Sequence, residues 1–128
     1  MTNTEKVERF IAAWEARDVD AMVELVSDDL FYHNIPMDPI LGKEGLKQFA
    51  APFLSNTAEV KWDLHHIAEN DSGIVLTERT DHFRMKTGKT VSIKVMGVFE
   101  FDANGLIYKW RDYFDLAEFQ TQMKDSAS

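Results

Sequence analysis

Residues 74–101 read IVLTERTDHFRMKTGKTVSIKVMGVFEF, and this stretch decides the fold. Two runs rich in β-branched and aromatic residues flank the short polar connection Thr87-Gly88-Lys89. Polar and apolar side chains alternate along both runs, which is typical of strands, and a short glycine-containing connection is typical of a hairpin. We therefore predict two long strands, over 74–85 and 90–101, joined by a tight turn.

The same pattern continues outward in both directions. Runs of similar composition occupy residues 58–68 and 106–114, and Asp71-Ser72-Gly73 and Asn104-Gly105 separate them from the central pair. These short glycine-containing segments also favour hairpin turns. Four sequential strands joined by tight turns predict an antiparallel meander.

Helical spacing precedes the meander. Apolar residues recur at intervals of three and four, which predicts two helices with one apolar stripe each. The stripes consist of Val7, Phe10, Ile11 and Trp14, and of Val19, Met22, Val23 and Val26. Asp18 is a candidate N-cap for the second helix. A short strand over 30–34, a two-proline loop over 35–39 and a third helix over 42–54 follow, and a closing helix is expected over 116–124.

This order of elements predicts the α+β class. The 128 residues have no linker or internal repeat, so we expect one domain over residues 1–128. A twisted antiparallel or mixed sheet whose one face is covered by the N-terminal helices would form a cone. The open interior of such a cone is a natural site for a small molecule.

Composition excludes several classes of function. The chain has 14 Lys and Arg against 22 Asp and Glu, a net charge of −8, which disfavours nucleic-acid and membrane-surface partners. It contains no cysteine, so disulfides, thiolate nucleophiles and Cys-ligated metals are excluded. The N-terminus lacks the pattern of a signal peptide and no run is long enough to span a membrane, so we expect a cytoplasmic protein.

Polar residues on the predicted inward faces are the candidate site. Because side chains alternate along a strand, Tyr32 and Asn34 share one face, and Arg79 and Asp81 share another face that is otherwise apolar. Asp112 lies on an aromatic face of the last strand. Each residue alone has a plain structural interpretation, such as an ion pair. Together they place two acids, an arginine, a phenol and an amide around one predicted cavity.

The four histidines do not predict a metal site. His33, His65, His66 and His82 lack the spacing of zinc ligands, so we expect no metal or other cofactor. His65 and His66 are adjacent in a predicted strand, so we expect them to face opposite ways. Met37, Phe83, Met85 and Phe114 are expected to line the cavity and to suit an apolar ligand.

Three motifs give a specific resemblance. The runs Tyr32-His33-Asn34-Ile35-Pro36-Met37, Glu78-Arg79-Thr80-Asp81 and Trp110-Arg111-Asp112-Tyr113-Phe114-Asp115 together resemble the limonene-1,2-epoxide hydrolase family. That family belongs to the cone-shaped superfamily shared with nuclear transport factor 2, ketosteroid isomerase and the SnoaL-like polyketide cyclases. The resemblance covers nearly the whole chain, with the motifs in the expected order.

The resemblance implies a cofactor-independent, one-step addition of water to an epoxide, giving a vicinal diol. By motif, Asp112 would be the base that deprotonates water, and Tyr32 and Asn34 would hold that water. Asp81 would be the acid that protonates the epoxide oxygen, and Arg79 would bridge the two carboxylates. General chemistry agrees, because an alkoxide leaves poorly unless it is protonated and two buried carboxylates disfavour each other's ionisation. The family also implies a homodimer, which an apolar outer sheet face would favour.

Two other functions remain open at this level. An isomerase or cyclase of the same fold would use Asp112 and Tyr32 but would leave the pair Arg79 and Asp81 without a task. A non-catalytic binding module, like nuclear transport factor 2, would need no buried Asp–Arg–Asp cluster. Acid–base catalysis with a pH-dependent rate would distinguish an enzyme from that module.

Overall fold

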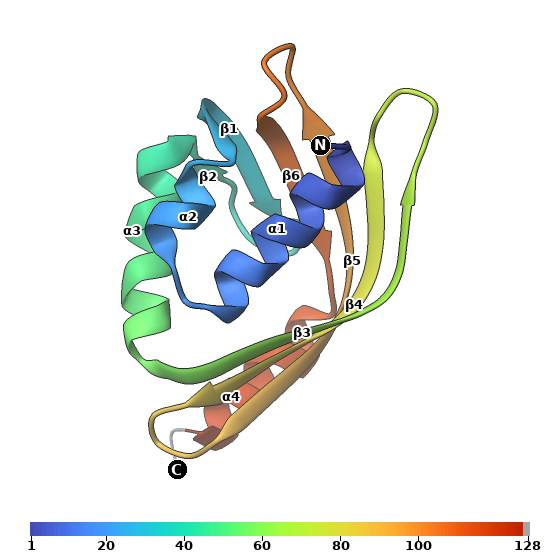
Figure 1. The fold of residues 1–128 in the computed structure, drawn as a ribbon. Helices are drawn as coiled ribbons and strands as arrows, with labels where there is room; N and C mark the ends of the chain where they lie inside the picture. Colours follow the sequence, from blue (N-terminus) through green and yellow to red (C-terminus); the bar gives the residue numbers. More distant parts are fainter. Residues whose placement is uncertain (127–128) are drawn as a thin grey trace.

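The computed structural model describes residues 1–126, so the last two residues of the predicted domain lie outside the description. Helices and strands follow one another as predicted, with one additional short strand (Figure 1). The elements are α1 Asn3–Glu15, α2 Val19–Val23, β1 Val26–Asn34, β2 Ile40–Leu41, α3 Gly42–Ser55, β3 Thr57–Glu69, β4 Val75–Met85, β5 Thr90–Phe101, β6 Ile107–Tyr113 and α4 Leu116–Ser126. None of these helices is long and apolar enough to cross a membrane.

All six strands form one mixed sheet in the order β2-β1-β6-β5-β4-β3. Strands β3 to β6 form the predicted antiparallel meander, and β1 adds to its edge by pairing in parallel with β6. In Figure 1 the sheet is strongly curved, and α1, α2 and α3 gather on one side of it. The predicted α+β cone is therefore confirmed.

Two local predictions need correction. We assigned Val26 to the second helical stripe, but α2 ends at Val23 and Val26 begins β1, where it pairs with Ile107. Val26 fits either pattern by spacing, and burial in the sheet decides between them. Strand β2 was not predicted because two residues carry no periodicity. The predicted cap is confirmed, since the Asp18 carboxylate accepts a hydrogen bond from the Ala21 N–H at 3.0 Å.

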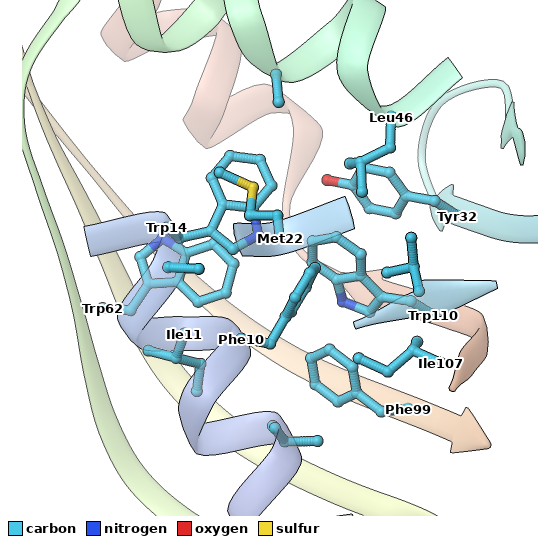
Figure 2. Close-up of a cluster of buried hydrophobic side chains, with 14 of the residues drawn as sticks. Phe10, Ile11, Trp14, Met22, Tyr32, Leu46, Trp62, Phe99, Ile107 and Trp110 are labelled. Carbon is cyan, nitrogen blue, oxygen red and sulfur yellow. The ribbon is translucent and has the colours of Figure 1, made fainter. Parts of the chain in front are cut away.

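The core is built around the ring of Trp110 from β6. Tyr32 stacks on it with a centroid distance of 3.9 Å and Phe99 with 5.5 Å, while Phe10 of α1 meets it edge-on at 5.1 Å. Figure 2 shows these rings gathered between α1 and the strands. Stacked and edge-on arrangements are the favourable ones for aromatic pairs. One indole thus joins the helical layer to two strands beside the candidate site.

We predict that Phe10→Ala lowers the free energy of unfolding by about 3–5 kcal/mol, because it removes a fully buried ring and leaves a cavity. Urea unfolding monitored by circular dichroism measures the change. Leu41→Ala is the control, since this side chain is 66% exposed and its loss should change stability by less than about 0.5 kcal/mol. Equal stability of the two variants would show that Phe10 does not anchor α1.

Candidate active site

The Arg79 guanidinium is the centre of a buried cluster. Its Nε and Nη2 donate to the two carboxylate oxygens of Asp81 at 3.0 and 2.9 Å. Its Nη1 and Nη2 donate to the two oxygens of Asp112 at 3.2 and 3.0 Å, and Nη1 also donates to Thr77 Oγ1 at 3.2 Å. All five N–H groups of the guanidinium are therefore used. One arginine fixes two carboxylates from different strands by a bidentate contact to each.

Aromatic rings support the same cluster. The Trp110 indole N–H donates to Asp112 Oδ1 at 2.8 Å, so this carboxylate accepts from both an indole and the arginine. The Trp62 ring lies 4.4 Å from the Arg79 guanidinium carbon, which is a cation–π contact. The charged groups are thus held between rings as well as by hydrogen bonds, out of contact with bulk water.

Gly97 leaves room for the Arg79 guanidinium because it has no side chain. It pairs with Asp112 on β6 and with Thr77 on β4, so it sits beside the cluster in the middle of β5. A Cβ there would lie 2.6 Å from Asp112 Oδ1 and 2.9 Å from Thr77 Oγ1, and closer still to Arg79. The sequence analysis missed this residue, although a glycine inside a strand is a known sign of close approach.

Tyr32 and Asn34 lie on the inward face of β1, as predicted. Asn34 pairs with Asp112 across the parallel β1–β6 ladder, which brings its amide next to the carboxylate. The Asn34 amide nitrogen donates to the Tyr32 hydroxyl oxygen at 3.0 Å, and that hydroxyl donates to Asn34 Oδ1 at 3.2 Å. His33, between them, points away and contacts the Met37 carbonyl oxygen at 2.8 Å.

A narrow cavity of about 70 Å³ brings these groups together. Tyr32, Asn34, Asp81 and Asp112 all reach its wall, whereas the Arg79 side chain is fully buried behind them. The rest of the wall is apolar and mostly aromatic: Trp14, Met37, Phe49, Phe53, Trp62, Phe83, Ile93, Val95, Phe114 and Phe119.

Three of the four predicted lining residues, Met37, Phe83 and Phe114, lie in the cavity wall, but Met85 does not. Met85 is the last residue of β4 and pairs with Thr57 next to the hairpin turn, past the end of the cavity. Four of the lining aromatic rings, those of Trp14, Phe49, Trp62 and Phe119, were not predicted to line the cavity. Trp14, Phe49 and Phe53 come from the covering helices. Their apolar stripes were predicted, but which rings reach the cavity depends on helix packing.

Burial and neighbouring charges shift the pKa values of groups in and beside the cluster. Burial raises the pKa of the Asp81 carboxyl to about 6, although Arg79 opposes this, and the nearby Asp112 adds to the rise. Burial disfavours the charged form of Arg79, but the two carboxylates together have a larger effect than burial. The pKa of Arg79 is therefore raised above its usual value. Burial also raises the pKa of the Tyr32 phenol, which therefore stays protonated. Two carboxylates and one arginine carry a net charge of −1, and a proton on Asp81 removes it.

The histidines lie away from the cavity. A bulge in β3 between Leu64 and His66 changes the register there, so both His65 and His66 face the outer side of the sheet. We expected opposite faces, and strict alternation fails at the bulge. His65 contacts Thr80 Oγ1 at 2.8 Å. Within residues 1–126, no group of three or more His, Asp or Glu side chains is arranged to hold a metal ion.

Comparison with known proteins agrees with this geometry. The family model described as the limonene-1,2-epoxide hydrolase catalytic domain matches residues 1–125. Epoxide hydrolase EphG of Mycobacterium tuberculosis is 37% identical over 111 residues, which cover 86% of this chain and 71% of that protein.

Solved structures give the same result. The structure of an LEH-like epoxide hydrolase of M. tuberculosis superposes with a TM-score of 0.83 at 30% identity, covering 98% of this chain and 91% of the other. A putative SnoaL-like polyketide cyclase of Shewanella denitrificans superposes with a TM-score of 0.84 over 96% of this chain and 97% of its own. Its 14% identity supports the shared fold alone.

We predict that Gly97→Ala disrupts the cluster, because the added methyl group occupies the space of the Arg79 guanidinium. The loss of thermal stability should correspond to roughly 1–3 kcal/mol, as expected for overpacking a buried site. Scanning calorimetry measures it, with Thr90→Ala at the exposed start of the same strand as control. A Gly97→Ala protein as stable as the control would refute the close approach.

Proposed function

Because the chain belongs to the limonene-1,2-epoxide hydrolase family, we propose that it hydrolyses an apolar epoxide to a vicinal diol in one step, without a cofactor. One observation supports this most directly: two carboxylates share one buried arginine and both reach one apolar cavity. An acid and a base are then present together at one small-molecule site.

Asp112 is the proposed base. Its carboxylate accepts hydrogen bonds from Arg79 and Trp110, which fix its position at the cavity wall. A water molecule next to it would be oriented by the Tyr32 hydroxyl and the Asn34 amide, which face the same cavity. As Asp112 takes the water proton, the water oxygen forms a bond to one epoxide carbon.

Asp81 is the proposed acid. With a pKa near 6, about a tenth of this carboxyl carries a proton at pH 7 and half of it does at pH 6, far more than for an ordinary aspartate. As the carbon–oxygen bond of the epoxide breaks, that proton passes to the departing oxygen and the diol is complete. Asp81 is then ionised and Asp112 protonated, so a proton must return from Asp112 to Asp81 before the next turnover. Arg79 is a positioning residue, because it touches both acids but not the cavity.

The cavity wall sets the proposed substrate class. Met37, Phe83 and Phe114 offer apolar surface, and the aromatic lining contributes no further charge. Such a wall favours a cyclic or terpene-like epoxide over a charged one, since burying a charge there would be costly. The same wall excludes bulk water, which strengthens the electrostatic effect of the cluster.

We predict that the protein converts limonene-1,2-oxide or a small cyclic epoxide to diol in the presence of a chelator. Asp112→Asn and Asp81→Asn should each lower the rate by about 10²-fold or more, because an amide can neither take nor supply the proton. Gas chromatography of the diol measures this, with Asp71→Asn in the exposed turn between β3 and β4 as control. Turnover near wild type in either cluster variant would remove that residue from its role.

We also propose a homodimer formed through the outer face of the sheet. Leu76, Met96 and Tyr113 are 43, 51 and 45% exposed on neighbouring strands, an apolar patch that a partner would cover. Two acids and two bases surround it, namely Glu78, Glu100, Lys94 and Arg111. These four charges balance one another although the chain carries −8, which suits contact with a second copy.

Sedimentation equilibrium should therefore give the dimer mass at micromolar concentration. Met96→Asp should shift the mass toward the monomer, because a carboxylate would be buried unpaired at the contact. Leu41→Asp, an exposed residue on β2, should leave the dimer intact. A monomer mass for the unmodified chain would end this proposal.

A further inference from the structure

The first half of β5 lacks a strand neighbour on its β6 side. Pairing between these strands begins at Met96 and Tyr113, so the backbone before Met96 has an open edge there. The side chain of Gln122 from α4 fills that edge at Ser92. Its Oε1 accepts from the Ser92 N–H at 2.7 Å, and its Nε2 donates to the Ser92 carbonyl at 2.8 Å. The amide thus makes the two hydrogen bonds that a neighbouring strand would make.

The same helix forms part of the cavity wall. Phe119 lines the cavity and meets Phe114, another lining residue, edge-on with a centroid distance of 6.0 Å. Gln122 follows Phe119 by three residues, so the two side chains lie on neighbouring positions of one helical face. In Figure 1, α4 lies beside the β4–β5 end of the sheet, apart from the other three helices.

We propose that Gln122 is a specificity-determining residue, which positions α4 and thereby sets how large an epoxide the cavity accepts. This inference rests on the proposed function, since it concerns the substrate of the same cavity. An 11-residue helix is marginal by itself in water, so its position depends on its contacts with the sheet. Among these contacts, the paired amide hydrogen bonds are directional and fix one position along β5.

Ser92 is held firmly from its other side. His82 Nδ1 lies 2.7 Å from the Ser92 hydroxyl, and His82 Nε2 lies 3.0 Å from Asp63 Oδ2. The strand is therefore braced by a three-residue chain across β3, β4 and β5. If the amide contact is lost, the helix rather than the strand is free to shift. Because the cavity is narrow, a small shift of Phe119 changes its capacity.

The test compares Gln122→Ala with Gln120→Ala, an exposed glutamine on the same helix. We measure kcat and KM for cyclohexene oxide and for the bulkier limonene-1,2-oxide. Gln122→Ala should raise the ratio of kcat/KM for the bulky over the small epoxide by roughly tenfold, the scale at which hydrophobic pockets discriminate size. Gln120→Ala should keep the wild-type ratio. Gln122→Glu can accept a hydrogen bond from Ser92 but cannot donate one to it. Its ratio of kcat/KM values should therefore lie between those of wild type and Gln122→Ala.

A second readout separates this inference from the proposed function. Trp14 and Trp62 line the cavity, so indole fluorescence can report binding of the unreactive ketones cyclohexanone and menthone. If no epoxide is hydrolysed, the proposed function fails. The role of Gln122 is still supported if Gln122→Ala raises the affinity for menthone relative to cyclohexanone. The inference about Gln122 is overturned if all three proteins are folded and show the same size preference, namely Gln122→Ala, Gln120→Ala and wild type.

Discussion

The contact of one buried guanidinium with two carboxylates is the constraint on which the rest of the structure depends. A buried carboxylate without a partner would be very costly, and two side by side would repel each other. Arg79 resolves this by giving two hydrogen bonds to Asp81 and two to Asp112. The cluster still carries one excess negative charge, which favours a proton on Asp81. In the proposed mechanism, an acid and a base thus arise from two chemically identical side chains.

The scaffold satisfies the geometric demands of that contact. Gly97 leaves room for the guanidinium in the middle of β5, and Trp110 orients Asp112 while its ring anchors α1 through Phe10. The parallel addition of β1 to β6 brings Asn34 beside Asp112. The polar groups of the cavity come from strands of the sheet. The helices cover the apolar side of the cavity and keep bulk water out.

Strand alternation allowed much of this to be predicted from the sequence. It placed Arg79 with Asp81 and Tyr32 with Asn34 on inward faces before any contact was known. It failed at His65, where a bulge breaks the period. Helical spacing failed at Val26, which fits a helix as well as a strand. The close approach of Gly97 to the Arg79 guanidinium depends on strand register. That the cavity ends before it reaches Met85 depends on register and on helix packing. These are tertiary properties without a local pattern.

The central claim is that Asp81 is the acid of the cluster, because its pKa is raised to about 6. Carboxyl ¹³C NMR of selectively labelled aspartate, titrated from pH 4 to 8 and assigned with Asp81→Asn, tests it most directly. The account predicts that the Asp81 resonance titrates near pH 6. An Asp81 carboxyl already fully ionised at pH 5 would contradict its assignment as the acid.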